Sequence, residues 1–136
     1  MGGSGGTSIA TAAMRALPVG VPKVMVSTVG GGDVSAYTGG KDITFIPSIV
    51  DVAGLNRLSR AIYTTAAGAI AGMVKLDKVA GHDEKPIVVA SMFGNTTQSV
   101  NQAKEIVEAA GYEVLVFHAT GTAARPWKAS SPTATA

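Results

Sequence analysis

The 136-residue chain contains no cysteine, and only 5% of its residues are aromatic and 15% charged. Without cysteine it can form neither a disulfide framework nor a thiolate zinc site, which fits a reducing cytoplasm. The longest apolar stretch, residues 66–74, is too short to cross a bilayer, and no signal peptide is recognisable after Met1. We therefore expect a cytoplasmic protein without a membrane segment.

An excess of charge of one sign is also absent. Eleven Lys and Arg residues face nine Asp and Glu residues, which gives a net charge of +2. The two additional positive charges are those of Arg125 and Lys128, so the rest of the chain is neutral. Because counterion-driven binding needs many basic residues on one face, we expect no direct binding of nucleic acid. The length is that of about one domain.

Glycine is abundant and unevenly placed, with ten of the 17 glycines in the first forty residues. The run 2–7 (GGSGGT) precedes a predicted helix over residues 8–17, with Thr7 as its N-cap and an apolar face of Ile9, Ala13 and Leu17. Glycines and free N–H groups at a helix N-terminus are typical of a phosphate or carboxylate site. The same residues are also typical of an engineered linker. No strand is predicted before them to hold the loop rigid.

The hydrophobic pattern predicts an α/β fold. Nearly continuous apolar segments predict parallel strands at 21–28, 43–46, 86–90 and 112–117, and helical periods predict helices at 8–17, 56–74 and 97–110. The last strand, helix and strand form a βαβ unit, whose right-handed crossover makes the two strands parallel. The polar run 76–85 predicts a linker. In the helix 56–74, Gly68 and Gly72 predict close approach of another element.

A second candidate site lies in residues 91–97, between a predicted strand end and a helix. Ligands of open α/β sheets bind outside the carboxyl ends of the strands. Gly94, Asn95 and Thr96 offer donors for a phosphate or ribose, and Thr122 follows the next strand. The alternative is that these residues only cap the helix, with Asn95 and Gln98 as a capping box.

Candidate catalytic residues are few. His82 and His118 have no second ligand at metal-binding spacing, so no metal site is predicted from them. Asp33, Asp42 and Asp51 lie in turns, where they either coordinate Mg²⁺ beside a nucleotide or serve turn chemistry alone. There is no Walker A pattern, no nucleophile elbow and no pair of carboxylates on one face. We therefore name no catalytic residue.

Long motifs of the chain resemble a known family. These are GGSGGTSIATAAMRALPVGVPKVMVST, DITFIPSIVDVAGLNRLSR, AAGAIAGM, KPIVVASMFGNTTQSV and AAGYEVLVFHATGT. Together they resemble the Tm-one-like ATP-binding domain family over residues 2–122. The resemblance implies a Rossmann-like parallel sheet in two subdomains, and a chain that is an internal fragment of a longer domain. Residues 2–75 would then be the later part of the first subdomain, and residues 86–122 the start of the second.

The resemblance also implies a cofactor, ATP with Mg²⁺, and a set of contacts in the glycine run and at the strand ends. The implied contacts are Gly2, Gly3, Ser4, Gly5, Gly6, Thr7, Ser27, Thr28, Gly94, Asn95, Thr96 and Thr122. After Thr122 the chain departs from the family pattern. We expect residues 123–136 to be disordered, and our hypothesis for their origin is a frameshift in the gene.

Two functions of different classes follow as hypotheses. The first is a fragment of an ATP- or nucleotide-binding α/β domain, with the phosphate held by the glycine run. The second is an interaction module without catalysis, in which the small residues of helix 56–74 contact a second subunit. A weaker third is a subunit of a hydrolase or ligase whose catalytic residues lie elsewhere. Because an incomplete sheet exposes strand edges, we also expect a homo-oligomer.

Overall fold

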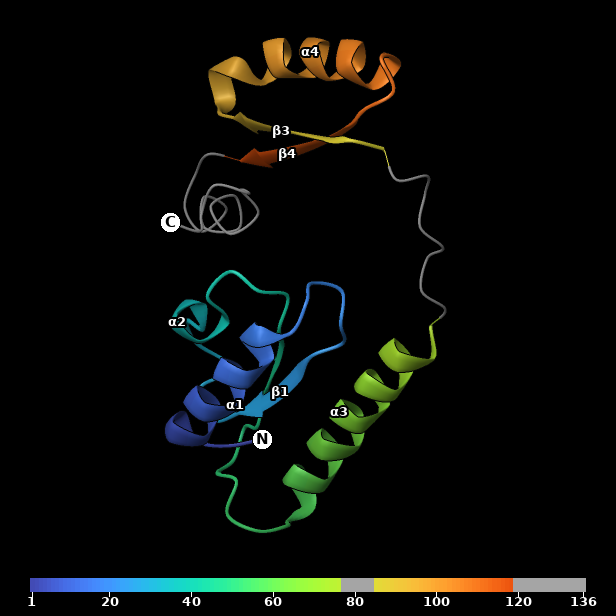
Figure 1. Cartoon of the computed structure of the whole chain (residues 1–136). Coiled ribbons are helices and arrows are strands. Elements are labelled where there is room, and N and C mark those ends of the chain that lie inside the picture. Colours follow the sequence, from blue (N-terminus) through green and yellow to red (C-terminus); the bar gives the residue numbers. More distant parts are fainter. Residues whose placement is uncertain (77–84, 119–136) are drawn as a thin grey trace. The chain divides into compact units, whose positions relative to one another are not determined.

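The computed structural model describes residues 1–76 and 85–118. The chain divides into two compact units, Met1–Lys78 and Val79–Ala136 (Figure 1). Both units combine helices with parallel strands, so the α/β class predicted from the sequence is confirmed. Most of the predicted linker, Thr122 and the predicted disordered tail lie outside the described residues. No helix within the described residues is long and apolar enough to cross a membrane.

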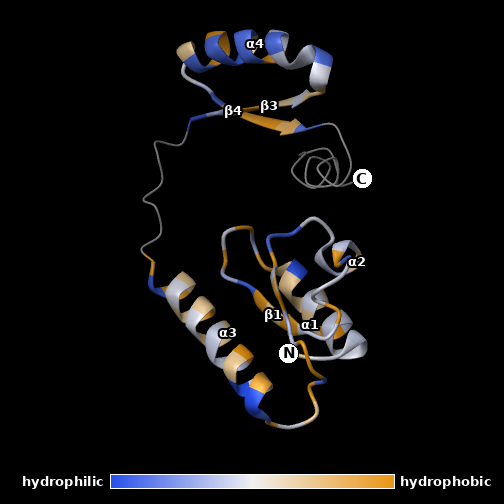
Figure 2. Ribbon diagram, turned by 180° about the vertical axis from the view of Figure 1, so that it is seen from behind, coloured by the Kyte–Doolittle hydropathy of each residue, from blue (hydrophilic) through white to orange (hydrophobic). Residues whose placement is uncertain are grey.

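The first unit has three layers around one central strand. Its elements are α1 (Ser4–Ala16), β1 (Val24–Ser27), α2 (Ser35–Thr38), β2 (Thr44–Pro47) and α3 (Arg57–Lys75). β1 and β2 pair in parallel, and β1 lies between α1 and α3 in both views (Figures 1 and 2). Successive side chains of a strand point to opposite faces, and the neighbouring residues Met25 and Val26 are both buried. The core therefore lies on both faces of β1.

Gly2 occupies a strand position on the other side of β1. It forms a parallel bridge with Ser27, because its N–H donates to Val26 O at 3.1 Å and its carbonyl accepts from Thr28 N at 3.3 Å. As predicted, no strand precedes the glycine run among the described residues, but this isolated bridge ties Gly2 to β1. α1 begins two residues later.

α1 differs from its prediction in start and in buried face. It begins at Ser4 with Gly3 as N-cap, so the predicted N-cap Thr7 lies inside the first turn. The predicted apolar face is exposed, with Ile9 at 78%, whereas Thr7 and Thr11 are fully buried. Their hydroxyls donate to the carbonyls of Gly3 and Thr7, at 2.7 and 2.8 Å. Because each hydroxyl is satisfied within the helix, burying this face leaves no polar atom unpaired.

α3 confirms the predicted helix. Asn56 is its N-cap and forms a capping box with Ser59, whose hydroxyl accepts from Asn56 N at 2.8 Å. The buried side of the helix packs on β1 through Ala66. A Cβ added at Gly68 or Gly72 would meet no atom within 4 Å. The predicted close packing on these two glycines is therefore not made by the described residues.

The second unit is the predicted βαβ unit. Its elements are β3 (Ile87–Met92), the short 3₁₀ turn η1 (Gly94–Thr96), α4 (Thr97–Ala109) and β4 (Glu113–His118). β3 and β4 pair in parallel from Ile87 with Glu113 to Met92 with His118. β3 runs two residues past its predicted end. Gly111, with φ of 91°, follows the end of α4 as predicted. Figure 2 shows hydrophobic residues concentrated on the two strands and hydrophilic residues along α4.

An ion pair between the buried Lys23 and the exposed Asp42 stabilises the amino-terminal end of β1. Lys23 is only 3% exposed. Its Nζ donates to Pro18 O at 2.9 Å and Val21 O at 2.7 Å, and lies 2.9 Å from Asp42 Oδ1. All three ammonium hydrogens thus have acceptors, as a buried charge requires. This ion pair also excludes Asp42 from the magnesium role considered above.

Asp42→Asn is expected to destabilise the first unit in a pH-dependent way. Partial burial raises the pKa of Asp42, but hydrogen bonds from Lys23 and from Gly20 N outweigh it and hold the pKa below 3.8. A carboxyl with a lowered folded-state pKa stabilises the fold above its unfolded pKa, and this contribution is lost as pH falls through the folded value. Because the Asp42 side chain is 39% exposed, solvent screens the pair, and the variant should lose about 1 kcal/mol at pH 7, measured by urea unfolding.

Near pH 3 the difference between the wild type and Asp42→Asn should shrink, because the wild-type carboxyl begins to take up its proton. Asp33→Asn is the comparison for a carboxylate without an ion pair, since Asp33 is exposed, pairs with no cation among the described residues, and accepts from the N–H, at 2.9 Å, and the hydroxyl of the nearby Ser35. Its effect on stability and the pH dependence of that effect should both be smaller than for Asp42→Asn. A constant difference between pH 7 and pH 3 would show that the ion pair contributes nothing to the Asp42 effect.

Candidate functional site

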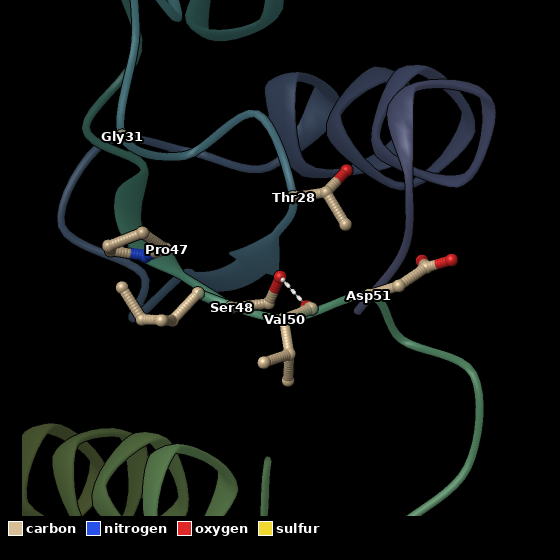
Figure 3. Close-up of a pocket in the computed structure, with 7 residues that line it drawn as sticks. Thr28, Gly31, Pro47, Ser48, Val50 and Asp51 are labelled. Atoms are coloured by element: carbon tan, nitrogen blue, oxygen red, sulfur yellow. Dashed lines mark hydrogen bonds between the residues drawn. The ribbon is translucent and has the colours of Figure 1, made fainter. Parts of the chain in front are cut away.

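A pocket lies at the edge of the first unit where its parallel strands end. β1 and β2 both have their carboxyl ends at this edge, and Gly2 is bridged to the last residue of β1, Ser27. Ligands of open α/β sheets bind at this edge of the strands. The pocket encloses about 590 Å³ (Figure 3), within the usual range of small-molecule sites. It is lined by Thr28, Gly31, Pro47, Ser48, Ile49, Val50 and Asp51.

The N-terminus of α1 lies beside this pocket. Thr28 Oγ1 is 3.8 Å from the position that a Cβ on Gly3 would take. Gly3 is the N-cap but has no side chain to cap the helix, and the first turn contains no acidic residue. The first N–H groups of a helix have no partner within it, and they carry the positive end of its dipole. Ser4, Gly5 and Gly6, which carry these groups, are exposed.

Two glycines allow the backbones around the pocket to pack closely. A Cβ on Gly2 would lie 2.9 Å from Gly6 Cα, so the backbone of Gly2 touches the first turn of α1. A Cβ on Gly30 would lie 3.2 Å from backbone atoms of Ile46 and Pro47. The loop after β1 therefore lies directly against β2. A Cβ at Gly2 would force the backbone to shift, and one at Gly30 would be tight.

The segment after β2 contains a strained turn. Val50 N donates to Ser48 O at 2.6 Å, which closes a three-residue γ-turn around Ile49. Ile49 has φ of 62°, a left-handed conformation that costs a β-branched residue free energy. The buried Ser48 fixes the turn, because its N–H donates to Ser27 O at 2.9 Å and its hydroxyl to Val50 O at 2.6 Å (Figure 3). Strain of this kind is common at binding sites.

Ile49→Gly is expected to stabilise the first unit by about 1 kcal/mol, because glycine adopts the left-handed conformation freely. Little packing is lost, since Ile49 is 72% exposed. Val50→Gly is the matched control. It should destabilise the unit, because glycine loses more conformational entropy on folding and Val50 has no positive φ that glycine would relieve. Thermal unfolding followed by circular dichroism measures both. A loss of stability in Ile49→Gly as large as in Val50→Gly would show that the turn holds no strain.

Two predicted contacts, Thr7 and Ser27, are fully buried. Their hydroxyl oxygens lie 2.6 Å apart, and each also bonds to backbone. They lie behind the edge rather than on its surface, so they do not offer donors to a ligand. Of the other predicted contacts of the first unit, Thr28 lines the pocket and Gly3 adjoins Thr28. Gly2 is buried, and Ser4, Gly5 and Gly6 are exposed in the first turn of α1.

The remaining predicted contacts belong to the second unit or lie outside the described residues. Gly94, Asn95 and Thr96 form η1 at the end of β3, where all three are exposed. The predicted capping box of Asn95 with Gln98 is wrong. Instead, Thr96 Oγ1 donates to Phe93 O at 2.9 Å and accepts from Phe93 N at 3.0 Å, because the 3₁₀ turn brings residue 96 back over residue 93. Thr122 is not among the described residues.

Sequence reasoning missed most of the lining that β2 contributes. Pro47, Ser48, Ile49 and Val50 had no signal of their own, although they directly follow a predicted strand, and strand ends were the criterion used for the second candidate site. The sequence predicts Asp51 either as a magnesium ligand or as a turn residue, and it is the one acidic residue of the pocket lining. Asp33 accepts from Ser35 N and hydroxyl, which lowers its pKa, and so serves turn chemistry.

These features define an α/β protein with a pocket at the carboxyl edge of parallel strands. The chain belongs to the uncharacterised protein family UPF0261. Residues 1–79 match the family's N-terminal domain and residues 85–128 its C-terminal domain. The resemblance stated from the sequence is thereby confirmed, because a tomato protein called Tm-1 is among the relatives.

Relatives come from bacteria and a plant. The chain is similar to a UPF0261 protein of Clostridium tetani, with 59% identity over 92% of this chain and 31% of that protein. A Rhizobium meliloti UPF0261 protein is 50% identical over the same shares. The ToMV resistance protein Tm-1(GCR237) of Solanum lycopersicum is 45% identical over 92% of this chain and 17% of its own length. The chain thus spans under a third of the length of these relatives.

Proposed function

We propose that the first unit binds a nucleotide through its phosphate groups, at the pocket beside α1. One observation carries this proposal: the uncapped N-terminus of α1 follows a strand-paired glycine and adjoins a pocket at the strand ends. Free N–H groups and the positive end of a helix dipole favour an anion there. The family resemblance supports ATP with Mg²⁺ as the ligand. A cytoplasmic location belongs to the same proposal and rests on the sequence argument.

Each part of the nucleotide has a suitable neighbour in this arrangement. The N–H groups of Ser4, Gly5 and Gly6 are available to phosphate oxygens, and the exposed Thr28 hydroxyl is beside them. A Mg²⁺ ion accompanying the phosphates would be held by the Asp51 carboxylate, since magnesium in such sites is bound by one or two carboxylates together with phosphate oxygens. The described pocket lining contains no second titratable group, so the proposal is binding, with no reaction assigned.

Apolar side chains at the same edge suit the nucleoside. Pro47, Ile49 and Val50 line the pocket on the side of β2. Ile49 is 72% exposed in the free chain, so a base stacked on it would remove apolar surface from water. Burial of such surface contributes roughly 25 cal/mol per Å². The phosphate end therefore gives the site its specificity, and the apolar end adds affinity.

Isothermal titration of the chain with ATP, ADP and adenosine in the presence of Mg²⁺ tests this proposal. ATP should bind at least about tenfold more tightly than adenosine, which corresponds to about 1.4 kcal/mol, because only ATP carries the groups that α1 favours. Equal affinity for ATP and adenosine would remove the helix N-terminus from the site. Absence of heat with all three ligands would sink the proposal for this chain.

A second candidate function is self-association through α3. We propose it because Gly68 and Gly72 form an exposed stripe on α3 that no described residue covers, and small residues let two helices approach closely. Light scattering should then give the mass of a dimer, and Gly68→Leu should raise the dimer dissociation constant at least about tenfold. Ser99→Leu, on the exposed side of α4, is the control. A monomer at high concentration argues against this candidate.

A further inference from the structure

Two buried hydroxyl groups join the N-terminus of α1 to the end of β1. Thr7 Oγ1 and Ser27 Oγ are 2.6 Å apart, and both side chains are fully buried. Thr7 Oγ1 also lies 2.7 Å from Gly3 O, and Ser27 Oγ lies 3.2 Å from Val29 N. Four groups are thus linked in one continuous chain of hydrogen bonds.

Counting hydrogens fixes the direction of this chain. A hydroxyl has one hydrogen to donate. Gly3 O is a carbonyl and can only accept, so the Thr7 hydrogen lies on that bond. At the 2.6 Å contact Thr7 must therefore accept, and Ser27 donates. Val29 N–H in turn donates to Ser27 Oγ. We call this chain of hydrogen bonds the relay; it runs from Val29 N–H through the Ser27 and Thr7 hydroxyls to Gly3 O. Hydrogen bonds in such a chain polarise and strengthen one another.

The two ends of the relay lie in the two walls of the proposed site. Gly3 is the N-cap of α1. Val29 begins the loop 29–32, whose Gly31 lines the pocket. The loop is held to β1 by Gly30 N, which donates to Ser27 O at 3.1 Å. Ser27 thus bonds to the loop and, through Thr7, to the helix terminus.

We infer that Thr7 and Ser27 are positioning residues that fix the N-terminus of α1 relative to the loop 29–32. This inference rests on the proposed function, since the two hydroxyls can change the affinity for a nucleotide only if the nucleotide binds at that site. Neither residue touches the ligand. Thr11 offers a matched comparison, because it is equally buried on the same helix face but its hydroxyl bonds only to carbonyls of its own helix, Thr7 O and Ser8 O.

The test compares Thr7→Val, Ser27→Ala, Thr7→Ser and Thr11→Val in the whole chain. Thr7→Val and Ser27→Ala should each weaken binding of ATP with Mg²⁺ by about tenfold, and their combination by little more, because both break one relay. Thr7→Ser keeps the hydroxyl and should bind within about twofold of the wild type. Thr11→Val should also stay within about twofold, because it removes no bond between the two walls.

Amide hydrogen exchange without nucleotide separates this inference from the function it rests on. Exchange at Val29 should be at least about tenfold faster in Thr7→Val and Ser27→Ala than in Thr11→Val and the wild type. If that holds while the wild type binds no ATP, the relay stands and the proposed function fails. Equal exchange at Val29 in all the variants overturns the inference, as does an ATP affinity in Thr11→Val that falls as far as in Thr7→Val. If Thr7→Val does not fold, Ser27→Ala and Thr7→Ser give the same comparison.

Discussion

Gly3→Asp is expected to abolish binding of ATP while leaving the fold as stable as before or slightly more so. Gly3 is the N-cap of α1, with φ of −71° and ψ of −167°, a conformation that aspartate adopts readily. Its new Cβ would meet only Thr28 Oγ1, at 3.8 Å, which is ordinary contact. Aspartate caps a helix better than glycine by a few tenths of a kcal/mol. The same carboxylate would occupy the N–H groups that a phosphate needs and would repel it.

The expected loss of affinity is about a hundredfold or more, equivalent to about 2.7 kcal/mol. Isothermal titration measures the affinity, and urea unfolding measures the stability. Ala12→Asp is the matched control, because it adds the same charge at an exposed position farther along α1 and should change the affinity by less than about twofold. Gly3→Asp that binds ATP as tightly as the wild type would exclude the helix terminus from the site. A Gly3→Asp variant that keeps or gains unfolding free energy but loses affinity for ATP would show that Gly3 serves binding rather than folding.

Gly2→Ala is expected to destabilise the first unit by about 2 kcal/mol, the cost of forcing extra atoms into a packed site. The new Cβ would lie 2.9 Å from Gly6 Cα and 3.0 Å from Gly6 C, and backbone atoms of a helix cannot move aside cheaply. Either α1 or the bridged residue 2 must therefore shift. The bonds of Gly2 to Val26 and Thr28 would be lost with that shift. Urea unfolding followed by circular dichroism measures the change.

Gly5→Ala is the matched control for Gly2→Ala. A Cβ at Gly5 would meet no atom within 4 Å, and alanine is favoured over glycine in a helix by up to about 1 kcal/mol. The two substitutions add the same methyl group three residues apart, so their effects should have opposite signs. A Gly2→Ala variant as stable as Gly5→Ala would contradict the close approach of α1 to the backbone of Gly2.

The elements predicted best from the sequence are those for which several local signals agree. The βαβ unit was predicted well because long apolar strands, a helical period and Gly111 all point the same way. α1 was predicted with the wrong buried face, because a count of apolar residues assigns the core to Ile9 rather than to Thr7. Thr7 and Thr11 satisfy their hydroxyls on helix carbonyls, and such bonds are invisible to a hydropathy pattern. Their small size then lets α1 approach β1.

Only part of the candidate site can be predicted from the sequence, because the rest depends on contacts between distant residues. The glycine run indicated an anion site at a helix start, and the structure places Gly3 and Thr28 together. The wall formed after β2 depends on Ile49 in a left-handed conformation, which its residue type disfavours, so no local rule predicts it. The roles of Thr7 and Ser27 depend on a contact between residues twenty apart. Only the fold shows that these two hydroxyls hold the edge together instead of forming its surface.

The most direct test of the central claim is an amide chemical-shift map of the chain on addition of ATP with Mg²⁺. We predict that the largest shifts fall on the first turn of α1, at Ser4, Gly5 and Gly6, with further shifts at Thr28, and that Gly3→Asp removes them all. Shifts confined to Gly94–Thr96 in the second unit, or no shifts at millimolar ATP, would contradict the claim that this helix terminus binds the phosphates.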